Sequence, residues 1–277
     1  MKKFLAVLLC GCLMMGVAAG CGTEQAETET EETNEVKVYP EHIDAFVDTA
    51  NFGEPPEIIY TTPASENGLE GELYKIEGED LYLIGTSEHS MIGKFIDTMT
   101  PEEELPKTLT SYSPCFRKEK GAHGIEERGV YRIHQFEKQE MIVVCKPEDS
   151  KMWFDKLWKN TVDLFRSMDI PVRTIECCSG DLADLKVKSY DVEAWSPRQK
   201  KYFEVGSCSN LGDAQARRLG IKVKGKDGKY FAHTLNNTVV APPRMLIAFL
   251  ENNLNEDGSI NIPKVLQPYM GGKTKIC

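Results

Sequence analysis

Two arginines, an aromatic ring and a glycine-containing loop lie close together between residues 116 and 136. Arg117 precedes the loop that contains Gly121 and Gly124, and Arg132 and Phe136 follow it. A guanidinium group binds two phosphate oxygens through parallel hydrogen bonds, so two strands joined by this loop form a plausible clamp for a nucleoside triphosphate. On charge alone, a solvated hairpin explains the pattern equally well, and both interpretations stay open at this point.

Two further clusters supply other residue types that phosphate chemistry uses. Glu204 and Ser207 lie near the end of an expected strand, where a carboxylate and a hydroxyl oxygen are suitable ligands for magnesium. Arg244 directly follows Pro242 and Pro243, which the first turn of a helix tolerates. We therefore expect Arg244 to lie in the first turn of a helix.

Strand-like segments must position these side chains, and they begin at about Glu72. Their apolar, β-branched and aromatic residues are typical of strands. The expected strands are Leu81–Ile84, Ser111–Phe116, Tyr131–Phe136, Met141–Cys145, Tyr190–Trp195 and Tyr202–Val205.

Helical spacing is clearest between Phe154 and Met168, where apolar residues recur every three or four positions. Asp149 or Ser150 is suited to cap this helix, and Pro171 ends it. Strands in hairpins with few helices predict an α+β fold, in which helices pack on an antiparallel sheet.

Charge is distributed unevenly along the 277 residues, whose formal net charge is -10. Residues 22–71 carry thirteen acids against the single base Lys37, whereas acids and bases balance in the remainder beyond residue 71. A neutral folded part argues against binding nucleic acid through bulk charge, although a local basic patch would escape such a count. The 41% apolar and 27% charged composition excludes collagen, coiled-coil and wholly disordered classes.

The first 21 residues resemble a bacterial lipoprotein signal peptide. Lys2 and Lys3 precede an apolar run over residues 4–19, and small residues lead into Cys21, the expected lipidation site. A cleaved N-terminal transmembrane anchor is the alternative, although the run is shorter than the roughly 20 residues a spanning helix needs. Residues 22–71 form an acidic linker followed by a segment without recognisable periodicity.

The cysteines beyond the leader are spaced as buried thiols commonly are, without a Cys-x-x-Cys motif. A zinc site built from Cys177, Cys178, Cys208 and a histidine is a conceivable alternative. Adjacent cysteines in a strand point to opposite faces, which disfavours that site.

Residues 72–277 resemble the catalytic domain of seryl-tRNA synthetase, a class II aminoacyl-tRNA synthetase. The arginine hairpin resembles the second signature motif of that class, and Thr238–Arg244 with its apolar helix resembles the third. Four segments between or before them stand in the expected order: Thr86–Glu88, Cys178–Leu182, Tyr190–Trp195 and Asp213–Arg218.

The resemblance implies a role for each matching residue. Arg117 is similar to the clamp on the α-phosphate and the substrate carboxylate, while Arg132 and Arg244 are similar to arginines that hold the terminal phosphates. Phe136 resembles the ring that stacks on adenine, and Glu204 and Ser207 resemble metal and phosphate ligands. The implied serine pocket consists of Thr86, Glu88, Arg117, Glu119, Glu140 and Thr238, with Glu140 accepting the serine hydroxyl. The implied catalytic set is Arg117, Glu119, Arg132 and Arg244.

The implied reaction uses serine, ATP and Mg²⁺ to form seryl-adenylate and then transfers serine to tRNA. The family also has an N-terminal arm that binds tRNA and a first signature motif that builds a homodimer interface, and neither is recognisable before residue 72. A non-catalytic, membrane-anchored lipoprotein that reuses the fold for ligand binding is therefore the second hypothesis. The expected location is the cytoplasm if the leader is an artefact, and the membrane if the signal is genuine.

Overall fold

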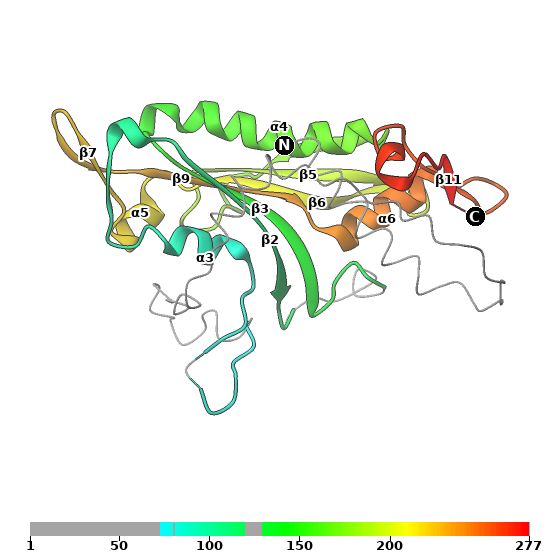
Figure 1. Cartoon of the computed structure of the whole chain (residues 1–277), viewed down its shortest axis with the longest axis horizontal. Coiled ribbons are helices and arrows are strands. Elements are labelled where there is room, and N and C mark those ends of the chain that lie inside the picture. Colours follow the sequence, from blue (N-terminus) through cyan, green and yellow to red (C-terminus); the bar gives the residue numbers. More distant parts are fainter. Residues whose placement is uncertain (1–72, 80, 120–128, 277) are drawn as a thin grey trace, which may run out of the picture.

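The structure, a computed structural model, describes residues 73–79, 81–119 and 129–276. Its centre is a six-stranded sheet in which every neighbouring pair is antiparallel (Figure 1). In spatial order the strands are β2 (Lys107–Phe116), β3 (Gln135–Cys145), β9 (His233–Val240), β6 (Lys201–Asn210), β5 (Lys188–Ser196) and β4 (Val172–Glu176). The expected α+β architecture is confirmed.

Helices cover both faces of this sheet. The long helix α4 (Ser150–Ser167) runs along one face, and α3 (Ser87–Gly93) and α5 (Ala214–Leu219) lie on the opposite side (Figure 1). Helix α6 (Pro242–Asn253) follows β9 directly and places Arg244 in its first turn, as expected.

Smaller elements surround the central sheet. A three-stranded sheet contains β1 (Met99–Pro101), β7 (Lys222–Gly225) and β8 (Gly228–Phe231), and a two-stranded sheet pairs β10 (Ile260–Asn261) with β11 (Lys275–Ile276). Short 3₁₀ turns occupy Glu102–Glu104, Pro147–Asp149 and Gln267–Met270.

Strand β3 is buried on both of its faces, because helices lie on each side of the sheet. Successive side chains of a strand point to opposite faces. Met141 and Val143 accordingly join the core beneath α4, while Ile142 and Val144 join a second core beneath α3 and α5. The two cores hold β3 rigidly, and the residues that precede Met141 on this strand are therefore well positioned to build a site.

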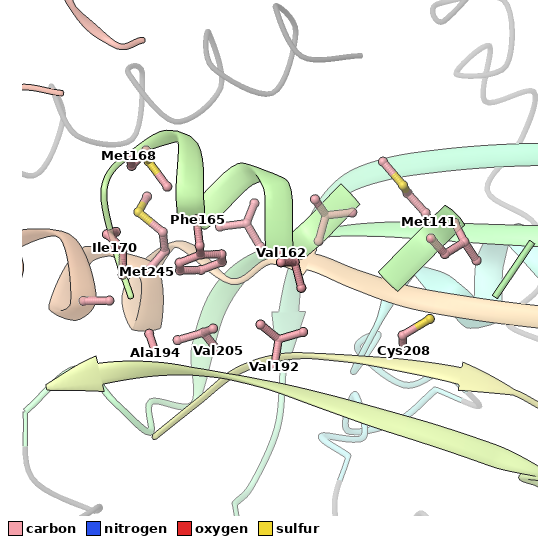
Figure 2. Close-up of a cluster of buried hydrophobic side chains, with 14 of the residues drawn as sticks. Met141, Val162, Phe165, Met168, Ile170, Val192, Ala194, Val205, Cys208 and Met245 are labelled. Atoms are coloured by element: carbon pink, nitrogen blue, oxygen red, sulfur yellow. The ribbon is translucent and has the colours of Figure 1, made fainter. Parts of the chain in front are cut away.

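The larger core lies between α4, α6 and the sheet (Figure 2). Phe165 of α4 is fully buried and lies near Met245 of α6, with Val192 and Val205 of the sheet below (Figure 2). The helical spacing read from the sequence thus identifies the buried stripe of α4. Asp149 occupies its N-cap position without a side-chain capping bond, and the Ser150 hydroxyl donates instead to the Pro147 carbonyl (3.0 Å).

The bounds of the expected strands differ from those in the structure: β2 begins earlier than Ser111 and β6 ends later than Val205. Two expected strands differ in more than length. Leu81–Ile84 forms only an isolated bridge, between Tyr82 and Lys75, and contacts the central sheet through a hydrogen bond from the Phe116 amide to the Ile84 carbonyl (2.7 Å). Tyr131–Phe136 becomes strand only from Gln135, since the partner strand β2 ends at the residue opposite Gln135. The strand then continues without a break to Cys145.

Some expectations fall on residues outside the described ranges. The leader (1–21), the acidic linker and unassigned segment (22–71) and the glycine-containing loop of the hairpin (120–128) all lie there. None of the helices within the described ranges is long and apolar enough to cross a membrane. No group of three or more His, Cys, Asp or Glu side chains within those ranges is arranged to hold a metal ion, which leaves the zinc alternative without support.

Candidate active site

A pocket of about 360 Å³ opens on the sheet beside the start of α3 and the start of α6. Strands β3, β6 and β9 contribute side chains to its lining. All eleven residues singled out from the sequence line this pocket: Thr86, Glu88, Arg117, Glu119, Arg132, Phe136, Glu140, Glu204, Ser207, Thr238 and Arg244. The structure therefore brings together segments that are up to 158 positions apart in the sequence.

Alternate residues of β3 form one wall and the buried end of the pocket. Phe136, Lys138 and Glu140 share one face of the strand because side-chain direction repeats every two residues. The Lys138 ammonium lies 2.6 Å from Glu140 Oε2 and donates to Thr86 Oγ1 (2.8 Å). The Thr238 hydroxyl donates to the same Glu140 oxygen (3.1 Å). This buried end is thus built from one ion pair and two hydroxyl groups.

Glu140 is almost completely buried, with 1% of its surface exposed. Burial raises the pKa of its carboxyl group, and the nearby negative charge of Glu88 acts in the same direction. The Lys138 ammonium and the Thr238 hydroxyl lower the pKa and partly offset these effects. The ionised state of Glu140 therefore depends on the partners that surround it.

Arg117 lies between α3 and the aromatic wall of the pocket. Its Nε donates to the Gly85 carbonyl (3.0 Å), and its guanidinium group lies 5.3 Å from the centre of the Phe136 ring. A Cβ atom at Gly85 would approach the end of the Leu73 side chain to 2.7 Å, so a larger residue there would have to displace Leu73. Arg117 is held by its Nε, and no residue within the described ranges hydrogen-bonds its terminal nitrogens, which can therefore reach a ligand.

Arg132 and Glu119 connect the two ends of the hairpin across the pocket. Their Nη1 and Oε2 atoms are 2.7 Å apart. Glu119 adopts a left-handed backbone conformation with φ of 48°, which is unfavourable for a residue other than glycine. A strained backbone that directs a carboxylate into a pocket is typical of a functional site.

Arg244 makes two contacts with Glu204 from the first turn of α6. Its Nη1 lies 3.2 Å from the Glu204 carboxylate and 3.3 Å from the Glu204 carbonyl oxygen. The guanidinium group also lies 4.5 Å from the centre of the Tyr131 ring, a cation–π geometry. The ring orients Arg244 toward the pocket.

Close approach of β6 to β9 shapes the pocket between these contacts. A Cβ atom at Gly206 would lie 2.6 Å from the Thr238 carbonyl oxygen, so only glycine fits there. Behind Thr238, the buried Asn237 amide donates to the Leu157 carbonyl (3.0 Å) and to the Thr161 hydroxyl (3.0 Å) of α4. These bonds fix the position of β9 and thereby of Thr238.

Positive charge exceeds negative charge in the lining. Five cationic and four carboxylate side chains face the pocket. Within the described ranges, Arg117 and Lys186 form no ion pair, although each lines the pocket. Cations without a carboxylate partner favour binding of an anionic ligand such as a phosphate or a carboxylate.

The sequence that forms this fold and pocket matches a known protein family. The profile described as "tRNA synthetase class II core domain (G, H, P, S and T)" matches residues 73–253, more than half of the chain. The chain belongs to this class II tRNA synthetase family. The antiparallel sheet and the pocket described above are the core of this synthetase fold.

Individual relatives of the synthetase core share its sequence closely. The chain is 48% identical over 223 residues to the serine–tRNA ligase of Picrophilus torridus, matching 79% of this chain and 50% of that protein. It is 45% identical over 216 residues to the serine–tRNA ligase of Sulfurihydrogenibium sp., matching 78% of this chain and 52% of that protein. The synthetase core thus spans about half the length of the curated relatives it matches.

Solved structures are similar as well. Seryl-tRNA synthetase from Pyrococcus horikoshii complexed with ATP superimposes with a TM-score of 0.74 at 36% identity, covering 98% of this chain and 55% of that one. Cytoplasmic serine–tRNA ligase from Naegleria fowleri in complex with AMP superimposes with a TM-score of 0.73 at 36% identity, covering 86% of this chain and 58% of that one.

Several pocket residues of the synthetase core were not singled out from the sequence. They are Tyr131, Lys138, Lys186, Ser209 and Asn236. Lys138 could have been predicted from Phe136 and Glu140. Residues 136, 138 and 140 of a strand point to the same face, because side-chain direction repeats every two residues. The others are isolated polar or aromatic residues without a comparable signal.

Proposed function

We propose that this chain catalyses the serine–tRNA ligase reaction, with the described pocket as its adenylation site. The observation that carries the proposal is the buried Glu140 carboxylate, which lies at the closed end of a pocket otherwise rich in arginine. A buried acceptor suits the hydroxyl group of a small amino acid, and the cations suit a triphosphate. The close relatives that carry the serine–tRNA ligase name support this reading.

Serine recognition is proposed to centre on Glu140 and Thr238, with Thr86, Glu88 and Glu119 lining the remainder of the amino-acid pocket. A buried carboxylate that loses a hydroxyl partner remains unsatisfied, which is costly. Alanine should therefore be rejected more strongly than its lack of one oxygen suggests.

ATP is proposed to bind along the cationic side. Arg117 would contact the α-phosphate and the serine carboxylate, and Arg132 and Arg244 the terminal phosphates, while Phe136 stacks on adenine. In the first step the serine carboxylate attacks the α-phosphorus and pyrophosphate leaves. These side chains position the reactants and neutralise developing charge without forming a covalent bond themselves.

The oxygen atoms of Glu204 and Ser207 are suitable ligands for Mg²⁺. Mg²⁺ prefers oxygen ligands and is commonly held by one or two carboxylates together with substrate phosphates. Glu204 and Ser207 present a carboxylate and a hydroxyl oxygen to the pocket. The ion would neutralise phosphate charge when bound.

Transfer of serine to tRNA and formation of a homodimer are further proposals, which rest on the family. The serine–tRNA ligases matched are about twice the length of the matched region. Charging of a tRNA transcript tests the transfer of serine. Gel filtration with light scattering tests the homodimer.

Serine-dependent exchange of labelled pyrophosphate into ATP tests the proposed function. The full chain with Mg²⁺ should exchange with serine and poorly with threonine or alanine, and Arg117→Ala should abolish exchange. Absence of exchange in a folded chain that binds ATP would reject the ligase and favour the second hypothesis, a ligand-binding lipoprotein.

Lipid modification at Cys21 is proposed from the leader sequence alone. Bacterial expression should then give a membrane-associated product, and Cys21→Ala should leave an unprocessed precursor. A soluble product that retains Met1 would reject the membrane location and favour the cytoplasm.

A further inference from the structure

Lys138 is a buried cation in the wall of the pocket, with 7% of its surface exposed. Its ammonium contacts Glu140 Oε2 (2.6 Å) and Thr86 Oγ1 (2.8 Å), and thereby joins β3 to the N-cap of α3. Because both Lys138 and Glu140 lie on the pocket face of β3, the pair forms part of the surface that a ligand meets.

A buried ion pair is a poor means of stabilising a fold. Removing two charges from water is unfavourable, and well-packed apolar residues of similar size commonly give equal or greater stability. The cores on both sides of β3 are already well packed around Met141 and Ile142. A role in ligand recognition therefore explains this pair better than a role in stability.

The contacts of Glu140 are concentrated on one of its two oxygens. Lys138 and Thr238 both bind Oε2, and no residue within the described ranges donates a hydrogen bond to Oε1. Oε1 is therefore the atom of this carboxylate that is left for a ligand.

We propose that Lys138 is a positioning residue for hydroxyl recognition, which holds Glu140 charged and fixes Oε2 so that Oε1 accepts the hydroxyl hydrogen of the substrate. The inference deepens the proposed function, because it names the residue that makes the Glu140 site selective for a hydroxyl group.

The charged groups around Glu140 support this role. Glu88 of α3 faces it with a like charge, Lys138 of β3 faces it with an opposite charge, and Thr238 of β9 supplies a neutral donor. The buried Cys115 thiol of β2 also lies within electrostatic reach. Burial and Glu88 favour the neutral acid, so Lys138 is the principal group that opposes protonation.

Loss of Lys138 should therefore raise the pKa of Glu140 further. Lys138→Met should shift Glu140 toward the protonated acid, a weaker and less directional acceptor than a carboxylate. Raising the pH ionises the acid and restores the acceptor, so serine recognition by this variant should reach its maximum at a higher pH than in the wild type.

The first test measures the carboxyl group in the ligand-free full chain. Carbon-13 NMR of labelled glutamate carboxyls follows the titration of Glu140, which Glu140→Gln assigns by loss of its signal. We expect a midpoint at least one pH unit higher in Lys138→Met than in the wild type, and a wild-type midpoint in Lys138→Arg. An unchanged midpoint in Lys138→Met would overturn the inference.

The second test measures recognition by pyrophosphate exchange. Lys138→Met should raise KM for serine at pH 7 by about tenfold or more, as expected for a weakened charged hydrogen bond. KM for ATP should stay within about twofold, and the serine defect should shrink at high pH. Lys107→Met is the matched control, because it removes an exposed lysine that pairs with Glu104 (2.7 Å) outside the pocket. A serine KM that equals the wild type at every pH would overturn the inference.

The two tests separate this inference from the proposed function. If the wild-type chain exchanges with no amino acid but the Glu140 midpoint moves, the ligase proposal fails and the electrostatic role of Lys138 stands. If Lys138→Met does not fold, Lys138→Gln replaces it, because its amide keeps a donor near Oε2 without the charge. The same rise in midpoint is expected, and its absence is equally decisive.

Discussion

Replacing Arg244 with alanine separates ligand binding from folding in this pocket. The side chain is 20% exposed and pairs with Glu204, which is 43% exposed. A partly exposed pair of this kind contributes at most about 1 kcal/mol to folding, and the contact with the Tyr131 ring about 0.5–1 kcal/mol. We therefore expect Arg244→Ala to destabilise the chain by about 1–2 kcal/mol.

The same change should weaken ATP binding much more. A hydrogen bond between a guanidinium group and a phosphate is worth about 1.5–3 kcal/mol, which corresponds to about 10- to 150-fold in affinity. The loss also leaves the Glu204 carboxylate without its Arg244 partner, next to the expected terminal phosphates. Both effects act in the same direction.

Calorimetric titration with ATP and Mg²⁺, together with thermal melting, measures the two effects. At about 2–4 °C per kcal/mol for a domain of this size, melting should fall by only a few degrees. Arg198→Ala is the control, because it removes an arginine that pairs with Glu251 (2.8 Å) outside the pocket lining. ATP affinity within twofold of the wild type in Arg244→Ala, or affinity lost equally in Arg198→Ala, would refute the phosphate role.

Three further changes probe the surroundings of the pocket. Gly206→Ala places a Cβ atom 2.6 Å from a backbone carbonyl of β9, and should cost about 1–3 kcal/mol in a denaturant melt and raise KM for serine. Gly93→Ala, with no atom within 4 Å of its new Cβ, should instead stabilise α3 by about 0.5–1 kcal/mol. Asn237→Ala removes the buried hydrogen bonds between its side-chain amide and α4 and should destabilise by about 1–3 kcal/mol in the same melt. Burial, with nearby acidic groups, raises the pKa of Cys145 to about 12, so peptide mass spectrometry after alkylation at pH 8 should find it unmodified and the exposed Cys178 modified.

Specific results would contradict these predictions. An unaltered melt of Gly206→Ala would mean that β6 and β9 are further apart than described, and an unaltered melt of Asn237→Ala would mean that water replaces its bonds. Alkylation of Cys145 at the rate of Cys178 would show that the core beneath α4 is open to solvent.

The motifs in the sequence, through their resemblance to a known family, predicted which residues would line the pocket. Arg117 and Arg244 lie far apart in the chain, but each stands in a motif whose local structure is simple, such as two prolines that start a helix. Glu140 was predicted from the resemblance alone. The structure places all eleven residues predicted for catalysis or ligand binding in one pocket, while their individual roles stay proposals, and the predicted lipidation site Cys21 lies outside the described ranges.

The central strand β9 was the main element that the sequence did not predict. Its residues Asn236 and Thr238 face the pocket, and Asn237 bonds to α4, so polar side chains occupy both faces. The usual alternation of apolar and polar residues is therefore absent from this strand. Lys138 was not predicted as a site residue. Its role depends on its contacts with Glu140 and Thr86, and the sequence does not show that Thr86 lies beside it.

Isotope transfer from serine tests the central claim most directly. When the full chain is incubated with ATP, Mg²⁺, hydroxylamine and serine labelled with ¹⁸O in both carboxylate oxygens, attack of the carboxylate on the α-phosphorus forms a serine–oxygen–phosphorus link. Hydroxylamine then breaks the bond between the carbonyl carbon and that oxygen. Mass spectrometry should find one ¹⁸O in each AMP released with wild-type protein and no AMP above background with Arg117→Ala. AMP without ¹⁸O, or no serine-dependent AMP from the wild type, would contradict the proposal that this pocket activates serine.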